Sequence, residues 1–198
     1  MKKKLLPCII ILLLCGMMYS CGKRKANSET LEQTIVKVAK AFQEKDTAII
    51  NSLILKEKGL IVLFRIGTFD QYTQIKTFDF SQLTPGFAPI ASFKTDFKVR
   101  FESLPTFDCD KMKWSKSGIY CDTTFRDKLL SETATNLKTY GGDTISAKGI
   151  ESFVELEKTS RRIVLSDTEG GALVFYLSLI HNKWYLTLLD RVTSDCSA

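Results

Sequence analysis

Histidine is almost absent from this chain of 198 residues, which holds one, His181. That count excludes zinc sites built from several imidazoles, and it leaves a Ser-His-Asp or Cys-His mechanism with a single candidate base. His181 and Asn182 separate two strand-like runs, so we expect the histidine at an exposed turn. We therefore predict no catalytic residue here, and no enzyme.

A stretch long enough to span a membrane is also missing. The longest apolar run, from Leu5 to Tyr19, has 15 residues, whereas a helix that crosses a bilayer needs about 20. The positive residues Lys2 to Lys4 precede this run, which is typical of an export signal rather than a permanent anchor. We assign residues 1–20 to a signal peptide.

The chain has little excess charge once this segment is removed. Residues 1–20 hold three of the 28 basic residues and none of the 22 acidic ones, so 25 basic and 22 acidic residues remain. This near balance predicts no nucleic-acid partner. Lys23, Arg24 and Lys25 follow the signal directly, where basic side chains can meet anionic headgroups at about 1 kcal/mol each.

The residues around the expected cleavage position favour one processing route. Met18 and Tyr19 fit an ordinary signal peptidase site poorly, because that site requires small residues before the cut. Met18-Tyr19-Ser20-Cys21 resembles instead the lipobox of bacterial lipoproteins, and its loosened form is similar to that of the Bacteroides group. The resemblance implies a lipid on Cys21, a tether over 21–29 and a membrane anchor. In the alternative, Cys21 is an incidental cysteine after an uncleaved or differently cleaved signal.

Cysteines are too few for a disulfide scaffold. Besides Cys21, the mature chain would keep Cys109, Cys121 and Cys196. Cys109 and Cys121 flank a predicted turn at residues 114–118, so we expect a disulfide between them, although the pairing needs a bulge or a shifted turn. A bond between Cys109 and Cys196, or free buried thiols, are the alternatives.

The rest of the chain predicts one α+β domain over residues 30–198, with helices in four places. Apolar residues recur at helical spacing from Leu31 to Phe42, and Asp46 can cap a second helix. A third helix is expected from Phe125 to a glycine stop after Tyr140, and a shorter one through residues 150–154.

Strand patterns fill the other segments. We expect a strand over 97–103, a hairpin with arms at 109–113 and 119–124, and a C-terminal meander over 162–166, 173–180 and 183–190. A two-residue turn at His181-Asn182 would place apolar residues opposite each other, in the pairs Leu179–Trp184, Leu177–Leu186 and Phe175–Leu188. The sheet is expected to be curved and antiparallel.

Two further groups of residues are candidate sites. Asp108, Asp110 and Asp122 would lie near one another on the predicted hairpin, as calcium ligands do, but exposed carboxylates give the same pattern and we predict no metal. Nine phenylalanines between residues 58 and 107 either line a ligand cavity or form plain core, and core is the preferred interpretation.

The order of elements, with the strand Lys183-Trp184-Tyr185-Leu186 after the final turn, resembles small Bacteroides-type lipoproteins whose domain is similar to nuclear transport factor 2. That resemblance implies a cone-like α+β domain with N-terminal helices packed on the sheet and a cavity inside. Members of the family range from isomerases to non-catalytic binding modules.

We therefore expect a membrane-anchored envelope lipoprotein that binds a small apolar ligand or an envelope protein, without a cofactor. The alternatives are a structural or assembly subunit of an envelope complex, and an isomerase or dehydratase acting in the cavity. Gly22-Lys23-Arg24-Lys25 departs from the acidic stretch associated with surface display, so we expect an outer-membrane protein that faces the periplasm.

Overall fold

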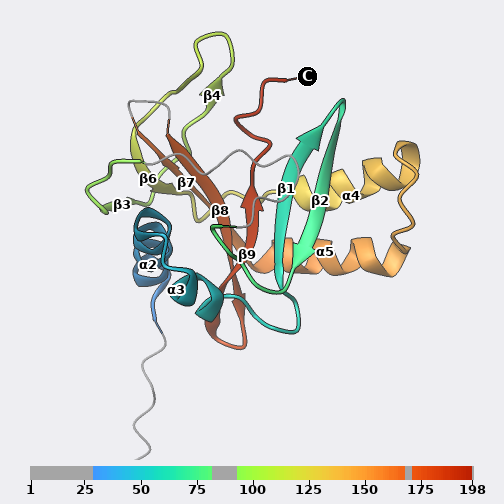
Figure 1. Cartoon of the computed structure of the whole chain (residues 1–198), viewed down its shortest axis with the longest axis horizontal. Helices are drawn as coiled ribbons and strands as arrows, with labels where there is room; N and C mark the ends of the chain where they lie inside the picture. Colours follow the sequence, from blue (N-terminus) through green and yellow to red (C-terminus); the bar gives the residue numbers. More distant parts are fainter. Residues whose placement is uncertain (1–28, 82–92, 168–170, 198) are drawn as a thin grey trace, which may run out of the picture.

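The computed structural model describes residues 29–81, 93–167 and 171–197. The expected signal peptide and Cys21 lie outside these residues. The chain is an α+β domain in which helices pack on both faces of a mixed seven-stranded sheet (Figure 1).

The two N-terminal helices form as the sequence predicts. Helix α2 spans Leu31–Glu44 and begins with a capping box, in which the side chains of Thr30 and Gln33 bond each other's backbone N–H groups. Helix α3 spans Thr47–Ser52, and the Asp46 side chain accepts a hydrogen bond from the N–H of Ile49 at 2.9 Å.

The large sheet has the order β2-β1-β9-β8-β7-β6-β3. Its strands are β1 (Leu60–Ile66), β2 (Phe69–Ile75), β3 (Val99–Arg100), β6 (Gly118–Cys121), β7 (Ser160–Ser166), β8 (Ala172–Ile180) and β9 (Lys183–Asp190). The pairs β1–β9 and β3–β6 are parallel and the others antiparallel, so the expectation of a purely antiparallel sheet is wrong. Long connections join the partners of both parallel pairs, and parallel pairing requires such connections.

The β8–β9 turn has the residues that a two-residue hairpin needs. His181 and Asn182 have φ values of 48° and 60°, as both central residues of a type I′ turn must. Leu179 lies opposite Trp184 as predicted. A bulge between Tyr176 and Leu177 shifts the pairing, so Phe175 lies opposite Leu189 and not Leu188.

The strand expected over 97–103 is wrong for most of its length. Of the described residues in this segment, only Val99–Arg100 pairs with another strand. Phe97 has a left-handed φ of 55°, which interrupts an extended chain, and Phe101 is exposed. The Asp96 carboxylate accepts hydrogen bonds from the N–H of Lys98 and from Arg100, which stabilises this turn.

The hairpin expected around residues 114–118 is displaced. Strand β4 (Phe107–Asp108) pairs with β5 (Lys113–Trp114), so the turn covers residues 109–112. Gly118 starts β6 instead, with a φ of 132°, and a Cβ there would lie 2.5 Å from Nη1 of Arg100.

Two helices cover the other face of the sheet. Helix α4 spans Leu129–Tyr140, four residues shorter at its start than predicted, and α5 spans Ala147–Thr159, longer than predicted. The left-handed glycine after α4 is Gly142 with a φ of 74°, whereas Gly141 at the cap has a φ of −94°.

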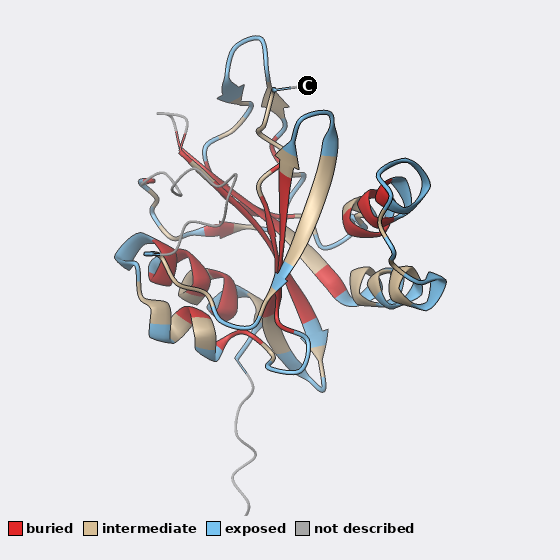
Figure 2. Cartoon of the chain, turned by 45° about the vertical axis from the view of Figure 1, so that its right-hand side comes forward, coloured by how far each residue is buried: buried red, intermediate tan, exposed pale blue. Residues whose placement is uncertain are grey.

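Successive side chains of the central strands point to opposite faces of the sheet, so the core consists of two clusters. Phe175 and Leu177 pack with α2 and α3, whereas Tyr176 between them packs with α4 and α5. The α2–α3 side holds the larger cluster, and the buried central strands separate it from the smaller one (Figure 2).

Candidate functional site

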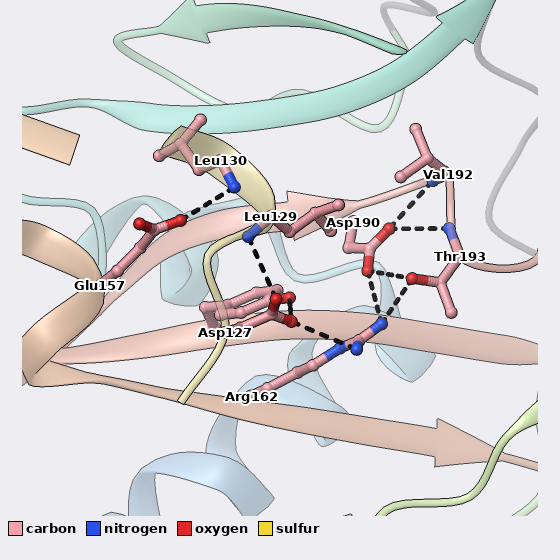
Figure 3. A network of polar contacts seen from close by, with 9 residues as sticks. Asp127, Leu129, Leu130, Glu157, Arg162, Asp190, Val192 and Thr193 are labelled. Atoms are coloured by element: carbon pink, nitrogen blue, oxygen red, sulfur yellow. Dashed lines mark hydrogen bonds and ion pairs between the residues drawn. The ribbon is translucent and has the colours of Figure 1, made fainter. Parts of the chain in front are cut away.

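A network of buried charges lies on the α4–α5 side of the sheet (Figure 3). Arg162 on β7 bonds Asp190 at the end of β9 through Nη2, at 2.9 Å, and pairs with Asp127, before α4, through Nη1, at 3.2 Å. The side chains of Arg162 and Asp127 are 15% and 17% exposed and that of Asp190 is 0% exposed, so water screens these pairs little.

Asp190 is held by its own chain as well as by Arg162. Its Oδ1 accepts hydrogen bonds from the N–H groups of Val192 and Thr193, both at 3.0 Å, and its Oδ2 accepts one from the Thr193 hydroxyl at 2.5 Å. An aspartate that ends a strand commonly closes a turn in this way. The same carboxylate therefore turns the chain and binds the arginine.

Tyr176 on β8 completes the network. Its hydroxyl donates a hydrogen bond to Oδ2 of Asp127 at 2.5 Å, and the Arg162 guanidinium lies 5.8 Å from the centre of its ring. Burial raises the pKa of Tyr176 far above its usual value, although Arg162 acts against this shift. The tyrosine thus remains a proton donor at neutral pH.

The same surroundings keep Arg162 charged. Burial lowers its pKa, but Tyr176, Asp190 and Asp127 raise it by more, and the net pKa lies above the ordinary value. Nε of Arg162 is buried without a hydrogen-bond partner within the described residues.

A second carboxylate on this side stabilises the start of α4. Lys128 occupies the N-cap position and its side chain cannot accept a hydrogen bond, so Asp127 and, from α5, Glu157 cap the helix. Oε1 of Glu157 accepts the N–H groups of Leu130 at 2.9 Å and Ser131 at 3.0 Å (Figure 3). Burial raises the pKa of Glu157, more than these hydrogen bonds lower it.

These groups connect elements on the α4–α5 side of the sheet. Asp127, Asp190 and Glu157 each accept hydrogen bonds from an arginine, a hydroxyl or backbone N–H groups. The contacts join the start of α4 to α5, β7, β8 and β9.

The structure corrects the expected disulfide. Cys109 bonds Cys196, the alternative partner, with their Cα atoms 5.7 Å apart, and Cys121 is free and buried. The displaced hairpin explains this, because Cys109 lies in the β4–β5 turn while Cys121 faces the core from β6. Burial raises the pKa of the Cys121 thiol to about 11.

The aspartates weighed as calcium ligands have local roles. Asp108 pairs with Lys111 at 2.7 Å in the β4–β5 turn, and Asp122 accepts hydrogen bonds from Thr124 after β6. Neither the described residues near them nor those elsewhere form a group of three or more His, Cys, Asp or Glu side chains able to hold a metal.

The aromatic stretch packs mainly against α2. The rings of Phe78 and Phe80 meet Phe42 edge to face, with centroids 5.4 and 5.5 Å away, and Phe93 is buried in the same cluster. Phe69 is exposed. Phe87 lies outside the described residues.

Sequence reasoning missed the network of Arg162. The sequence contained one signal for it. Arg162 precedes the apolar run Ile163-Val164-Leu165, and Asp190 follows Leu188-Leu189, so both charges lie inside or at the end of a buried strand. Such charges are almost never buried unless they are paired. The pattern did not identify the partner of either charge.

Comparison with known proteins gives no relative. No protein-family model matches the chain, and no curated protein and no solved structure matches it either. None of the helices that the structure describes is long and apolar enough to cross a membrane.

Proposed function

We propose that this protein is a membrane-anchored envelope lipoprotein whose domain is a non-catalytic binding module. The observation that carries the proposal is Cys21, which follows Met18-Tyr19-Ser20 just after a 15-residue apolar run that lysines precede. A lipid on Cys21 would anchor the domain on the periplasmic side of the outer membrane.

The order of elements supports a domain similar to nuclear transport factor 2. Two helices precede the sheet, and consecutive strands β7, β8 and β9 pair antiparallel at its centre. In this proposal the strands form the C-terminal meander of a cone-like sheet that holds a ligand or supports a surface for a partner.

The polar network supports a non-catalytic role. The carboxylates of Asp127 and Asp190 are bound to Arg162, and the pKa of Tyr176 is too high for it to act as a base near neutral pH. His181 lies exposed in the β8–β9 turn. These groups therefore favour a fixed scaffold over an isomerase or dehydratase.

Exposed apolar side chains favour a protein partner over a small ligand. Ile66, Phe69 and Met112 are 50%, 40% and 59% exposed, and they lie at or beside the β1–β2 and β4–β5 turns. Both turns lie at the end of the sheet opposite the start of α2 (Figure 1). The Cys109–Cys196 disulfide holds the β4–β5 turn in place. A partner at this end would also fit a structural or assembly subunit.

The lipid is tested by changing Cys21 to alanine in a bacterial host supplied with labelled palmitate. We expect loss of the label and accumulation of the uncleaved precursor, because lipid attachment precedes cleavage at a lipobox. Cys121→Ala is the matched control and should be labelled and processed normally. Normal processing of the Cys21→Ala chain would refute the proposal.

The partner is tested by native mass spectrometry of protein purified from its own membrane. We expect a complex with a partner protein, and we expect Ile66→Asp or Met112→Asp to abolish this complex while the circular dichroism spectrum stays unchanged. Recovery of the protein with a bound small molecule in place of a protein would favour the ligand-binding form of the proposal. Recovery with neither would count against both forms.

A further inference from the structure

One end of the domain gathers basic and aromatic side chains beside the start of α2. The α3–β1 connection, the end of β2 and the β8–β9 turn all lie there, as both views show (Figures 1 and 2). We call this set of segments, residues 53–59, 76 and 179–185 with the start of α2, the basal end.

The basal end must lie close to the membrane if Cys21 carries the lipid, so the inference rests on the proposed function. Seven residues, 22–28, separate the lipid site Cys21 from the first described residue, Glu29, so the chain makes eight steps between them. A chain spans at most about 3.3–3.6 Å per residue, which limits the separation to about 28 Å. The opposite end of the sheet has no such constraint.

The charges of the basal end complement an anionic surface. Lys56, Lys58, Lys76 and Lys183 are exposed, and Glu57 is the acidic residue among these segments. At the start of α2, Glu29 pairs with Lys37 at 2.9 Å, and Glu32 is exposed. The basal end thus has four exposed lysines against three exposed glutamates, and most of the basic excess comes from Lys23, Arg24 and Lys25 of the tether.

The β8–β9 hairpin adds the side chains that occupy the boundary between water and lipid. Leu179 is 39% exposed and lies opposite Trp184. On the other face, the Lys183 ammonium lies 5.0 Å from the centre of the Tyr185 ring. Tryptophan and tyrosine concentrate at membrane interfaces, and lysine can reach the headgroups from there.

We infer that the basal end rests on the anionic headgroups of the membrane that holds the lipid anchor. The lipid would hold the domain at the membrane and the lysines would determine which end faces it, since each basic side chain near anionic headgroups contributes about 1 kcal/mol. The domain would then stand in one orientation, with Ile66 and Met112 facing away from the membrane.

The two tryptophans of the chain provide the test. Trp184 lies in the basal end, whereas Trp114 lies on β5 in the hairpin at the opposite end. The lipidated protein is placed in vesicles of phosphatidylethanolamine and phosphatidylglycerol that carry a fluorescence quencher at headgroup depth. We expect strong quenching in Trp114→Phe, which retains Trp184, and little quenching in Trp184→Phe.

Charge reversal then tests the contribution of the lysines. Lys58→Glu and Lys183→Glu should each lower the population of the resting orientation by roughly fivefold or more, and quenching of Trp184 should fall with it. The matched control is Lys138→Glu, because Lys138 is an exposed lysine of α4 that lies outside the basal end. This variant should leave the quenching of Trp184 unchanged. Circular dichroism checks that each variant is folded.

The outcomes separate this inference from the proposal beneath it. Protein that fails to float with the vesicles would refute the lipid anchor. Protein that floats but shows equal quenching of Trp114 and Trp184, or quenching that persists after both lysine reversals, would refute the orientation and leave the anchor in place.

Discussion

At the scale of single residues, Arg162 on β7 connects the end of β9 to the start of α4. It neutralises Asp190, which is fully buried, and Asp127, which precedes α4. A buried pair of this kind contributes little relative to well-packed apolar residues, but a buried charge left alone is costly. The consequence of removing one partner is therefore large even where the contribution of the pair is small.

Arg162→Met should lower the free energy of unfolding by roughly 3–5 kcal/mol, because it leaves the two carboxylates without a cation. Urea denaturation at neutral pH measures this change. The control is Arg126→Met, an exposed arginine that bonds the carbonyls of Thr123 and Phe125, which should change the value by at most about 0.5 kcal/mol. A loss below about 1 kcal/mol for Arg162→Met would show that water or other groups compensate the charges.

Glu157 gives stability a pH dependence whose sign follows from its raised pKa. The native protein binds the proton more tightly than the unfolded chain, in which the ordinary value of 4.5 applies. The favourable contribution is therefore complete below pH 4.5 and is lost as pH rises through the native pKa.

Glu157→Gln does not titrate, so the advantage of the wild type over this variant should shrink as pH rises from 4 to 7. Urea denaturation at several pH values measures the difference. Glu151→Gln, an exposed residue of the same helix, is the control and should show a constant difference. A wild-type advantage that grows with pH would contradict the burial of Glu157 as the dominant effect.

At the scale of elements, the sequence predicted those that are specified locally. Thr30 and Asp46 cap helices, and His181-Asn182 select a hairpin turn, through contacts with their nearest neighbours. The bulge at Tyr176 and the parallel pairing of β1 with β9 depend on distant segments, and no local pattern encodes them. The candidate site was missed for the same reason, since Arg162 and Asp190 are 28 residues apart.

The displaced β4–β5 hairpin shows how the dependence on distant segments limits the prediction of a disulfide. The actual turn, at 109–112, begins five residues before the expected one at 114–118, and that shift moves Cys109 from a strand to an exposed turn. Cys196 then becomes its partner across 87 residues.

Removing this disulfide with Cys109→Ser and Cys196→Ser should cost about 2–5 kcal/mol, because the bond closes a long loop in the unfolded chain. Thermal unfolding measures the loss. Reduction of the wild type should reproduce it, whereas Cys121→Ala keeps the bond and controls for the change in thiol content. Equal stability of oxidised and reduced protein would contradict the expected contribution.

At the scale of the whole molecule, β9 joins the two halves of the chain. It lies between β1, its parallel partner from the N-terminal half, and β8, its antiparallel partner. Its residues also contribute to both clusters, with Leu186 and Leu189 on the α2–α3 side and Leu188 on the other. Without β9, both β1 and β8 would expose an unpaired edge in the middle of the sheet.

Two truncations should therefore behave in opposite ways. A chain of residues 29–198 keeps every described contact of both clusters and should unfold cooperatively, whereas a chain that ends at Asn182 should not fold, because it lacks β9 and exposes apolar surface. Thermal unfolding followed by circular dichroism distinguishes the two, and gel filtration detects aggregation of the second. Loss of cooperative unfolding in the 29–198 chain would show that residues 1–28 contribute to the core.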